Sequence, residues 1–348
     1  MREHHVYCSS CQQGRIDRFV LDEASGRLDR LETLAIPDAQ APTISHPLAL
    51  SRDRRFLYAA VRVPPYRIAT FAISPADGSL EYRGRVATAG SLAYLTLDVP
   101  GNFLLGASLP DSLLVSHRID PASGIVEEPV QVIRDVAKAH SIVIDSESRF
   151  AYAAALGEDR VRHLQFDSRT GTMSAADSCS VQLHSGAGPR HLAFDPRERF
   201  VYCLNETDGT IDALARDTQS GALSFLQTTS LFAPDFKRPA NVRSADLAVD
   251  PGGSFLYASE RSSSTIATLR IDPETGALHR LGSIDTEASP RGIRITPSGR
   301  WLLVAGELSG SIVVYEKNAA TGDLRMVCRA PASAGANWIV MTEKPTGA

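Results

Sequence analysis

Short runs of alternating apolar and polar residues repeat along the whole chain, and they come in pairs that a polar turn separates. In each pair the first run is short and apolar, and the second is rich in aromatic residues. An alternation with a period of two is typical of β-strands, and no segment carries a sustained helical period of 3.6 residues. Five of these pairs are HPLALSRDRRFLYAA, HSIVIDSESRFAYAA, RHLAFDPRERFVYCL, ADLAVDPGGSFLYAS and RGIRITPSGRWLLVA.

A second kind of turn, of which DEASGRL is the first example, supplies the other half of the repeat. A polar residue opens the turn, and a glycine provides the positive φ that a tight hairpin needs. Alternating residues flank it on both sides, as in TIATLRI before and ALHRLGSI after DPETG. The turn glycine recurs every 46 to 55 residues, at Gly26, Gly78, Gly124, Gly171, Gly221, Gly276 and Gly322.

Together the two signals give four strands per unit, which is the composition of one β-propeller blade. Seven units predict an all-β, seven-bladed β-propeller with four-stranded blades. We expect one domain over residues 1–348, although this length would by itself suggest about two. Residues 4–34 supply only three strands, and ANWIVMT (336–342) supplies the missing inner strand. The C-terminal strand should therefore close the first blade and remove its open sheet edges.

Composition and charge exclude several classes of partner. The chain is 43% hydrophobic and 22% charged with a net charge of −4, so nothing attracts it to nucleic acid or to an anionic membrane. No apolar run approaches the roughly 20 residues that cross a bilayer. The start lacks the apolar stretch of a signal peptide and the five cysteines are an odd number, so we expect a cytoplasmic protein. Cys8 and Cys11 form a CxxC without a second ligand pair, which favours a structural role over zinc binding.

Blade geometry brings two strand ends from every blade to one mouth of the central channel, because the inner strand starts there and the second strand returns there. Aligned repeats place these residues at the starts of the inner strands, in blade order: Asn337, His46, Ala93, His140, Arg190, Ala245 and Arg291. They place these residues at the ends of the second strands: Cys11, Arg62, Leu109, Leu156, Glu206, Arg261 and Glu307.

These two rings hold four arginines and two histidines against two glutamates, in a chain of negative net charge. Clustered guanidinium groups suit a small anionic ligand, because they bind phosphate or carboxylate as a fork. We expect Arg243, in the connector FAPDFKRPANVRSADL, to overhang the same mouth. An arginine such as Arg62 could instead be a solvated rim residue, and His191 should face into its blade as a structural histidine.

The sequence contains no Gly-rich phosphate loop, no G-x-S-x-G elbow and no dinucleotide fingerprint. The mouth is dominated by arginine, whereas a bound divalent cation would need converging oxygen ligands. We therefore expect no cofactor and no metal, which leaves acid–base and electrostatic catalysis by histidine, glutamate and arginine.

Three stretches resemble the propeller-type 6-phosphogluconolactonases of bacteria: GAGPRHLAFDPRERFVYCLNE (186–206), SPRGIRITPSGRWLLVAGE (289–307) and ALGEDRV (155–161). The similarity covers essentially the whole chain, including the split first blade. It implies hydrolysis of 6-phosphoglucono-δ-lactone to 6-phosphogluconate in the oxidative pentose phosphate pathway, without a cofactor.

The same fold family includes fungal carboxymuconate-cyclizing enzymes, whose proposed site comprises a histidine, two arginines and a glutamate. By motif position these fall on His140 (KAHSIVID), Arg190 (GPRH), Glu206 (LNE) and Arg261 (SERSSS). One departure is that the blade-six motif, commonly S-N-R, has a glutamate at Glu260. An extra carboxylate there could weaken phosphate binding and favour an unphosphorylated lactone.

The sequence therefore predicts a lactone hydrolase that acts on a small anionic lactone. Glu206 or His140 would activate water, and Arg190 would stabilise the oxyanion. The predicted substrate-binding residues are Arg261, Arg291, Arg243, His46, Arg62, Glu307 and Asn337. The alternatives are a lactonase for unphosphorylated aldonolactones, a carboxymuconate-type cycloisomerase that uses the same groups, and a non-catalytic propeller scaffold.

Overall fold

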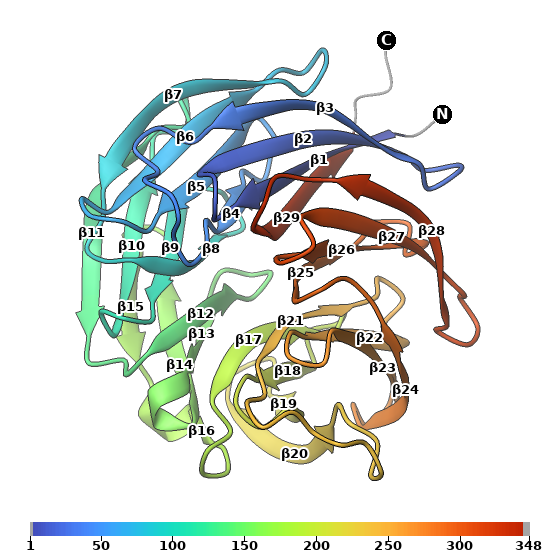
Figure 1. Cartoon of the computed structure of the whole chain (residues 1–348). Helices are drawn as coiled ribbons and strands as arrows, with labels where there is room; N and C mark the ends of the chain where they lie inside the picture. The colour runs from blue at the N-terminus through green and yellow to red at the C-terminus, as the bar shows by residue number, and fades with distance from the viewer. Residues whose placement is uncertain (1–2, 344–348) are drawn as a thin grey trace.

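The computed structural model describes residues 3–343, which form seven antiparallel sheets arranged as a ring of blades around a central channel (Figure 1). This confirms the predicted seven-bladed propeller of four-stranded blades. Blade 1 comprises β29 (Ala336–Glu343), β1 (Glu3–Ser10), β2 (Arg15–Asp22) and β3 (Leu28–Ala35) from the channel outward. Blade 2 comprises β4 (Leu48–Leu50), β5 (Phe56–Val61), β6 (Arg67–Ile73) and β7 (Leu80–Ala87).

The next three blades follow in chain order. Blade 3 comprises β8 (Leu92–Leu97), β9 (Phe103–Ser108), β10 (Leu113–Ile119) and β11 (Val126–Arg134). Blade 4 comprises β12 (Ala139–Ile144), β13 (Phe150–Ala155), β14 (Arg160–Asp167) and β15 (Thr172–Ala175), with β16 (Val181–Gln182) also paired to β14. Blade 5 comprises β17 (Pro189–Phe194), β18 (Phe200–Asn205), β19 (Thr210–Arg216) and β20 (Leu223–Ser230).

Two further blades complete the ring. Blade 6 comprises β21 (Ser244–Val249), β22 (Phe255–Glu260), β23 (Thr265–Ile271) and β24 (Leu278–Asp285). Blade 7 comprises β25 (Pro290–Ile295), β26 (Trp301–Gly306), β27 (Ser311–Lys317) and β28 (Leu324–Pro331). Short 3₁₀ turns occur at Leu156–Glu158 and Asp177–Cys179. No helix in the described part of the chain is long and apolar enough to cross a membrane.

The first blade is closed by the two ends of the chain, as predicted. β29 pairs antiparallel with β1, with His4 opposite Glu343 and Ser10 opposite Ala336. Figure 1 shows the red C-terminal strand β29 on the channel side of the blue strand β1. Because this pairing joins the two termini within one sheet, the ring has no open edge between its first and last blades.

The repeated glycines are explained by packing between neighbouring blades. Each turn glycine has a φ of +71 to +79°, and a Cβ built on it would lie 2.2–2.5 Å from a ring of the preceding blade. Only glycine satisfies both constraints at these positions. The ring residues, in the order of the glycines from Gly26 to Gly322, are Trp301, His5, Phe56, Phe103, Phe150, Phe200 and Phe255.

Hydrogen bonds reinforce this contact in most blades. The hydroxyl of the tyrosine two residues further along the same strand donates to the carbonyl of the turn glycine, over 2.7–3.2 Å. The indole Nε1 of Trp301 donates to the Glu23 carbonyl and so joins blade 7 to blade 1. The five tyrosines are Tyr7, Tyr58, Tyr152, Tyr202 and Tyr257.

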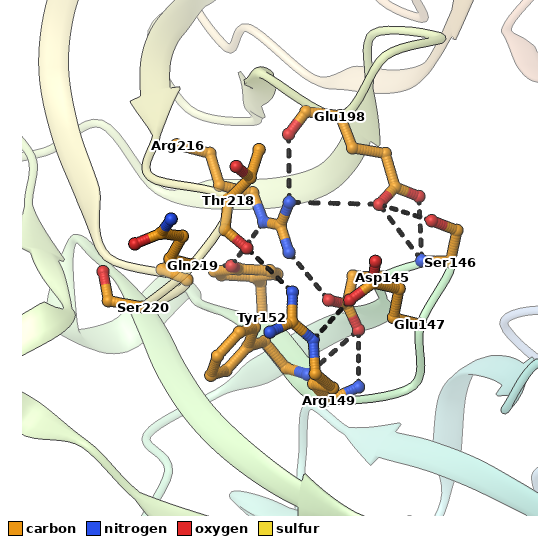
Figure 2. Close-up of polar contacts among 12 residues, drawn as sticks. Asp145, Ser146, Glu147, Arg149, Tyr152, Glu198, Arg216, Thr218, Gln219 and Ser220 are labelled. Atoms are coloured by element: carbon orange, nitrogen blue, oxygen red, sulfur yellow. Dashed lines mark hydrogen bonds and ion pairs between the residues drawn. The ribbon is translucent and has the colours of Figure 1, made fainter.

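A buried ion pair adds a further connection between blades 4 and 5, at the end of the blades opposite the predicted mouth. Figure 2 shows the Arg216 guanidinium between Asp145, Tyr152 and Glu198. It donates to Asp145 Oδ2 over 2.7 Å, to the Tyr152 hydroxyl over 2.8 Å and to the Glu198 carbonyl over 3.1 Å. Since each side of this guanidinium has a protein acceptor, we interpret the cluster as structural.

Truncation of the chain after Gly335 should strongly destabilise the protein, because it removes β29 and leaves β1 as an unpaired inner edge. We expect the truncated chain to be insoluble or to melt far below the intact protein in a thermal denaturation experiment. Truncation after Glu343, which keeps β29, is the control. An unchanged Tm after loss of residues 336–348 would contradict the closure of blade 1 by its C-terminal strand.

Candidate functional site

The two predicted rings meet at one end of the channel and form a set of buried and half-buried charged and imidazole side chains that we call the mouth cluster. Its ion pairs lie both within and between blades. Glu206 of blade 5 lies against side chains of blades 4, 5 and 6, and Arg291 and Glu307 pair within blade 7. The mouth cluster comprises His46, Arg62, His140, Arg190, Glu206, Arg261, Arg291 and Glu307.

Irregular pairing at the starts of the inner strands orients three of these side chains. The register shifts between Ala139 and Ser141 in β12, between Pro189 and His191 in β17, and between Pro290 and Ile293 in β25. A β-bulge turns an unpaired residue out of the regular alternation of the strand. His140, Arg190 and Arg291 lie in these three shifts, and all three side chains are buried.

Glu206 is the centre of the mouth cluster. Its Oε1 accepts a hydrogen bond from Arg261 Nη2 over 2.5 Å, and its Oε2 lies 3.2 Å from Arg190 Nε. Burial would raise the pKa of Glu206, but the charges of Arg190 and Arg261 outweigh burial and hold this pKa below its ordinary value. The carboxylate is therefore ionised at neutral pH, and it contacts Arg190 of the adjacent strand in the same blade.

His140 lies beside this carboxylate as a neutral imidazole. Its Nε2 is 3.7 Å from Glu206 Oε2, and its Nδ1 is buried without a hydrogen-bond partner in the described part of the chain. Burial, followed by the charge of Arg190, lowers the pKa of His140 well below its ordinary value. At neutral pH the imidazole can therefore accept a proton.

Arg291 and Glu307 form a second ion pair at the mouth, with 2.5 Å between Nη1 and Oε1. The same Nη1 donates to the Ile44 carbonyl over 2.6 Å. Burial would raise the pKa of Glu307, but Arg291 outweighs burial and lowers this pKa. The two residues therefore reach the mouth as a neutralised pair.

Two predicted binding residues are held by local contacts. His46 is fully buried, its Nδ1 lies 3.0 Å from the Ala60 carbonyl, and burial lowers its pKa. The Asn337 side chain accepts from Ser9 Oγ over 3.3 Å and donates to the Gly335 carbonyl over 2.8 Å. Both residues organise the backbone where blades 1 and 2 meet the channel.

The alternative that Arg62 is a solvated rim residue is wrong, because only 8% of the residue is exposed. Burial and then the charge of Arg291 lower the pKa of Arg62 to about 10, so it remains protonated at neutral pH. Arg243, in contrast, is exposed, and its carbonyl accepts from Arg261 Nε over 3.0 Å. Arg243 thus holds Arg261 through its backbone.

The Glu260 carboxylate does not form an ion pair with the neighbouring Arg261. The Glu260 carboxylate is 1% exposed and accepts hydrogen bonds from the backbone N–H groups of Arg243, Ser262 and Ser263. The Glu260 carboxylate is thus bound by the backbone of its own turn, whereas the Arg261 guanidinium donates to Glu206. The glutamate in the blade-six motif therefore shapes the loop that carries Arg261.

His191 faces the channel, and the prediction that it faces into its blade is wrong. Strict alternation would place Arg190 and His191 on opposite faces, but the shift in β17 brings both to the channel. Arg190 Nη1 donates to His191 Nε2 over 2.9 Å, and His191 Nδ1 lies 2.8 Å from Asp246 Oδ1. Because Nε2 accepts from Arg190, Nδ1 must carry the proton that Asp246 accepts.

An aromatic layer lies across the channel around His191. Its ring contacts His140 of blade 4, Tyr94 of blade 3 and Trp338 of blade 1, with centroids 5.2–5.7 Å apart. Sequence reasoning missed Tyr94, Asp246 and Trp338, although all three lie on inner strands just beyond the predicted ring positions. The same alignment of inner strands, extended by one or two residues past the ring positions, would have pointed to these three residues.

Cavities lie away from the mouth cluster. One of about 490 Å³ occupies the channel on the other side of the aromatic layer, with Tyr94, Asp246, Arg294 and Trp338 in its lining. Another of about 650 Å³ is bordered by residues of blades 1, 2 and 3, including Phe56. We place the candidate site at the mouth cluster because the convergent acid, base and guanidinium groups are there.

The cysteines provide no metal centre. Cys8 and Cys11 are both buried and free, and Cys11 Sγ lies 3.8 Å from Glu307 Oε1. Within residues 3–343, no group of three or more His, Cys, Asp or Glu side chains is arranged to hold a metal ion.

Comparisons with known proteins agree with this fold and identify the family. Residues 5–341 match the family described as "Lactonase, 7-bladed beta-propeller". The chain is 33% identical to the 6-phosphogluconolactonase of Serratia proteamaculans, in an alignment that covers 97% of this chain and 99% of the relative. It is 34% identical to the 6-phosphogluconolactonase of Pectobacterium atrosepticum, in an alignment that covers 97% of this chain and 98% of that relative. The solved structure of the periplasmic gluconolactonase of Pseudomonas aeruginosa superimposes with a TM-score of 0.86 at 22% identity, covering 99% of this chain and all of that one. The chain therefore belongs to the seven-bladed β-propeller lactonase family.

Proposed function

We propose that this protein hydrolyses 6-phosphoglucono-δ-lactone to 6-phosphogluconate at the mouth cluster. The observation that carries the proposal is an ionised Glu206 held between Arg190 and Arg261, with a neutral imidazole at His140 beside it. Family membership and full-length relatives named 6-phosphogluconolactonase support it. The test is the rate of ring opening of this lactone with purified protein, above its spontaneous hydrolysis.

In this mechanism water attacks the ester carbonyl and transfers a proton to His140. Both oxygens of Glu206 lie against guanidinium groups, whereas His140 Nδ1 has no hydrogen-bond partner in the described part of the chain, so we assign the base to His140. The imidazolium that forms is stabilised by Glu206, 3.7 Å away. Arg190 stabilises the oxyanion, and the proton returns to the ring oxygen as the C–O bond breaks.

A second candidate is hydrolysis of an unphosphorylated aldonolactone. The specific observation in its favour is that Arg261 and Arg291, both expected to bind phosphate, each have a carboxylate partner at 2.5 Å. Assays on phosphorylated and free gluconolactone separate the two candidates. Turnover of a carboxymuconate in the same assays would instead support the cycloisomerase alternative.

We also infer that the protein acts in the cytoplasm as a single domain. Five cysteines without disulfide partners support this location, because thiols remain reduced there.

Arg190→Ala and Glu206→Gln should each lower kcat by about 10²–10³-fold, because each removes a group that stabilises charge in the transition state. Both side chains lie at the mouth and outside the apolar core between blades, so the fold should survive. Steady-state kinetics and circular dichroism measure the two effects. Arg15→Ala, which changes an exposed arginine of β2, is the control. A near-normal kcat in Arg190→Ala would rule out its role at the oxyanion.

Activity should persist well into the acid range. The pKa of His140 lies well below its ordinary value of about 6.5, and the pKa of Glu206 is also lowered, so both groups remain unprotonated as the pH falls through neutrality. The acid limb of kcat/KM, measured from about pH 4 to pH 8 with the spontaneous rate subtracted, should therefore lie below about 6.5. Loss of half the activity at or above that pH would contradict these lowered pKa values.

His191→Ala should lower kcat by about 10²-fold with little change in KM, because a misplaced catalytic group reduces the rate of the chemical step. The variant removes the acceptor that fixes the Arg190 guanidinium. His191→Gln keeps a side-chain acceptor and donor and should recover part of the loss. If His191→Ala only lowers Tm while kcat per folded molecule stays normal, the histidine does not position Arg190.

A further inference from the structure

The arginines of the mouth cluster differ in how their charges are neutralised. Arg190 and Arg261 share Glu206, and Arg291 has Glu307. Arg62 has only neutral partners: its Nε donates to Ser91 Oγ over 3.1 Å, and its Nη1 donates to Ser45 Oγ over 2.6 Å. Among residues 3–343, no carboxylate oxygen lies within 4.0 Å of the Arg62 guanidinium.

A buried cation without a counter-ion is an unusual feature in a folded protein. Burying an isolated charge is unfavourable unless a partner of opposite charge compensates for the lost hydration. Arg62 is 8% exposed, and after burial the charge of Arg291 has the largest effect on its pKa, which it lowers, whereas Asp111, bound to the Ser91 backbone, acts in the opposite direction without pairing with Arg62. The protein therefore maintains beside its candidate site a positive charge that no carboxylate contacts directly, and an anionic group of a ligand would neutralise it.

The surroundings of Arg62 provide further hydrogen-bond donors. Ser45 Oγ accepts from Arg62, and within the described residues its own proton has no acceptor. Ser45 is buried at the start of blade 2, and Ser91 is buried at the start of blade 3. A guanidinium with a serine hydroxyl beside it matches the several acceptor oxygens of a phosphate group.

The position of Arg62 also fits the geometry of a phosphorylated lactone. Arg62 directly follows β5 of blade 2, whereas Arg190 and Glu206 belong to blade 5, on the other side of a seven-bladed ring (Figure 1). Its charge is nevertheless among the causes that lower the pKa of His140. In 6-phosphoglucono-δ-lactone the phosphate is carried on C6, beyond the ring oxygen and C5 from the reacting carbonyl.

We propose that Arg62, with the Ser45 hydroxyl, binds the phosphate of the substrate, while Arg261 and Arg291 remain paired to their glutamates. This inference rests on the proposed lactonase function for the identity of the substrate. Under this proposal, the residues where blades 2 and 3 meet distinguish phosphorylated from free lactones. The arginines of blades 6 and 7 do not.

The test compares Arg62→Gln, Arg62→Lys and the control Arg15→Gln with the wild-type protein. Arg62→Gln should raise KM for the phosphorylated lactone by about 10- to 150-fold, as expected for loss of a charged hydrogen bond, with little change in kcat. KM for free gluconolactone should change by less than about threefold, since that substrate carries no charge for Arg62 to bind. Arg62→Lys, which keeps the charge but not the fork, should be intermediate.

Calorimetric titration with inorganic phosphate gives a readout independent of turnover. Wild type and Arg15→Gln should bind phosphate more tightly than Arg62→Gln by about tenfold or more. If the wild type hydrolyses neither lactone and phosphate binding still depends on Arg62, the proposed function fails while the anion site stands. If both lactones are hydrolysed and Arg62→Gln changes them equally, or binds phosphate as the wild type does, the assignment of Arg62 is overturned.

Discussion

The contact between an aromatic ring of one blade and the turn glycine of the next is the constraint on which the rest of the structure depends. It occurs at all seven interfaces between blades, including the one between Trp301 of blade 7 and Gly26 of blade 1. The rings enter space that a Cβ would occupy, so each blade fixes the position of its neighbour. The site depends on this ring closure, because its charged groups come from blades that are far apart in the sequence.

The site itself combines two departures from regular β-structure. Shifts in strand pairing turn His140, Arg190 and Arg291 toward the mouth, where a regular alternation would leave fewer side chains. The second departure is that charged groups are buried at the mouth. Glu206 and Glu307 form ion pairs with the three guanidinium groups of Arg190, Arg261 and Arg291, whereas Arg62 has no carboxylate as an ion-pair partner. An excess of fixed positive charge in a partly buried site is suited to an anionic substrate and to a developing oxyanion.

The sequence was sufficient to predict the fold because the repeat encodes it. Gly26 and its six counterparts mark the hairpins, and the second strand of each blade carries the aromatic residue that packs on the turn glycine of the next blade. The ring alignment also placed Arg190 and Glu206 at the same mouth, since adjacent strands of one blade end together, and the two side chains are in contact there.

The errors arose where local pairing or side-chain direction was decisive. The shift in β17 placed His191 in the channel, which a regular alternation does not predict. The Glu260 carboxylate accepts hydrogen bonds from backbone N–H groups of its own loop, and Arg62 is buried. The conformation of the loop determines the direction of each of these side chains. Tyr94, Asp246 and Trp338 were missed because residues below the mouth lie on strands that read only as core.

A crystal structure of the full-length protein with bound 6-phosphogluconate would locate the active site. We expect the product carboxylate within hydrogen-bond distance of Arg190, close to His140, and the phosphate at Arg62. Product bound instead in the cavity beyond the aromatic layer, or in the cavity beside Phe56, would contradict the assignment of the mouth cluster as the active site.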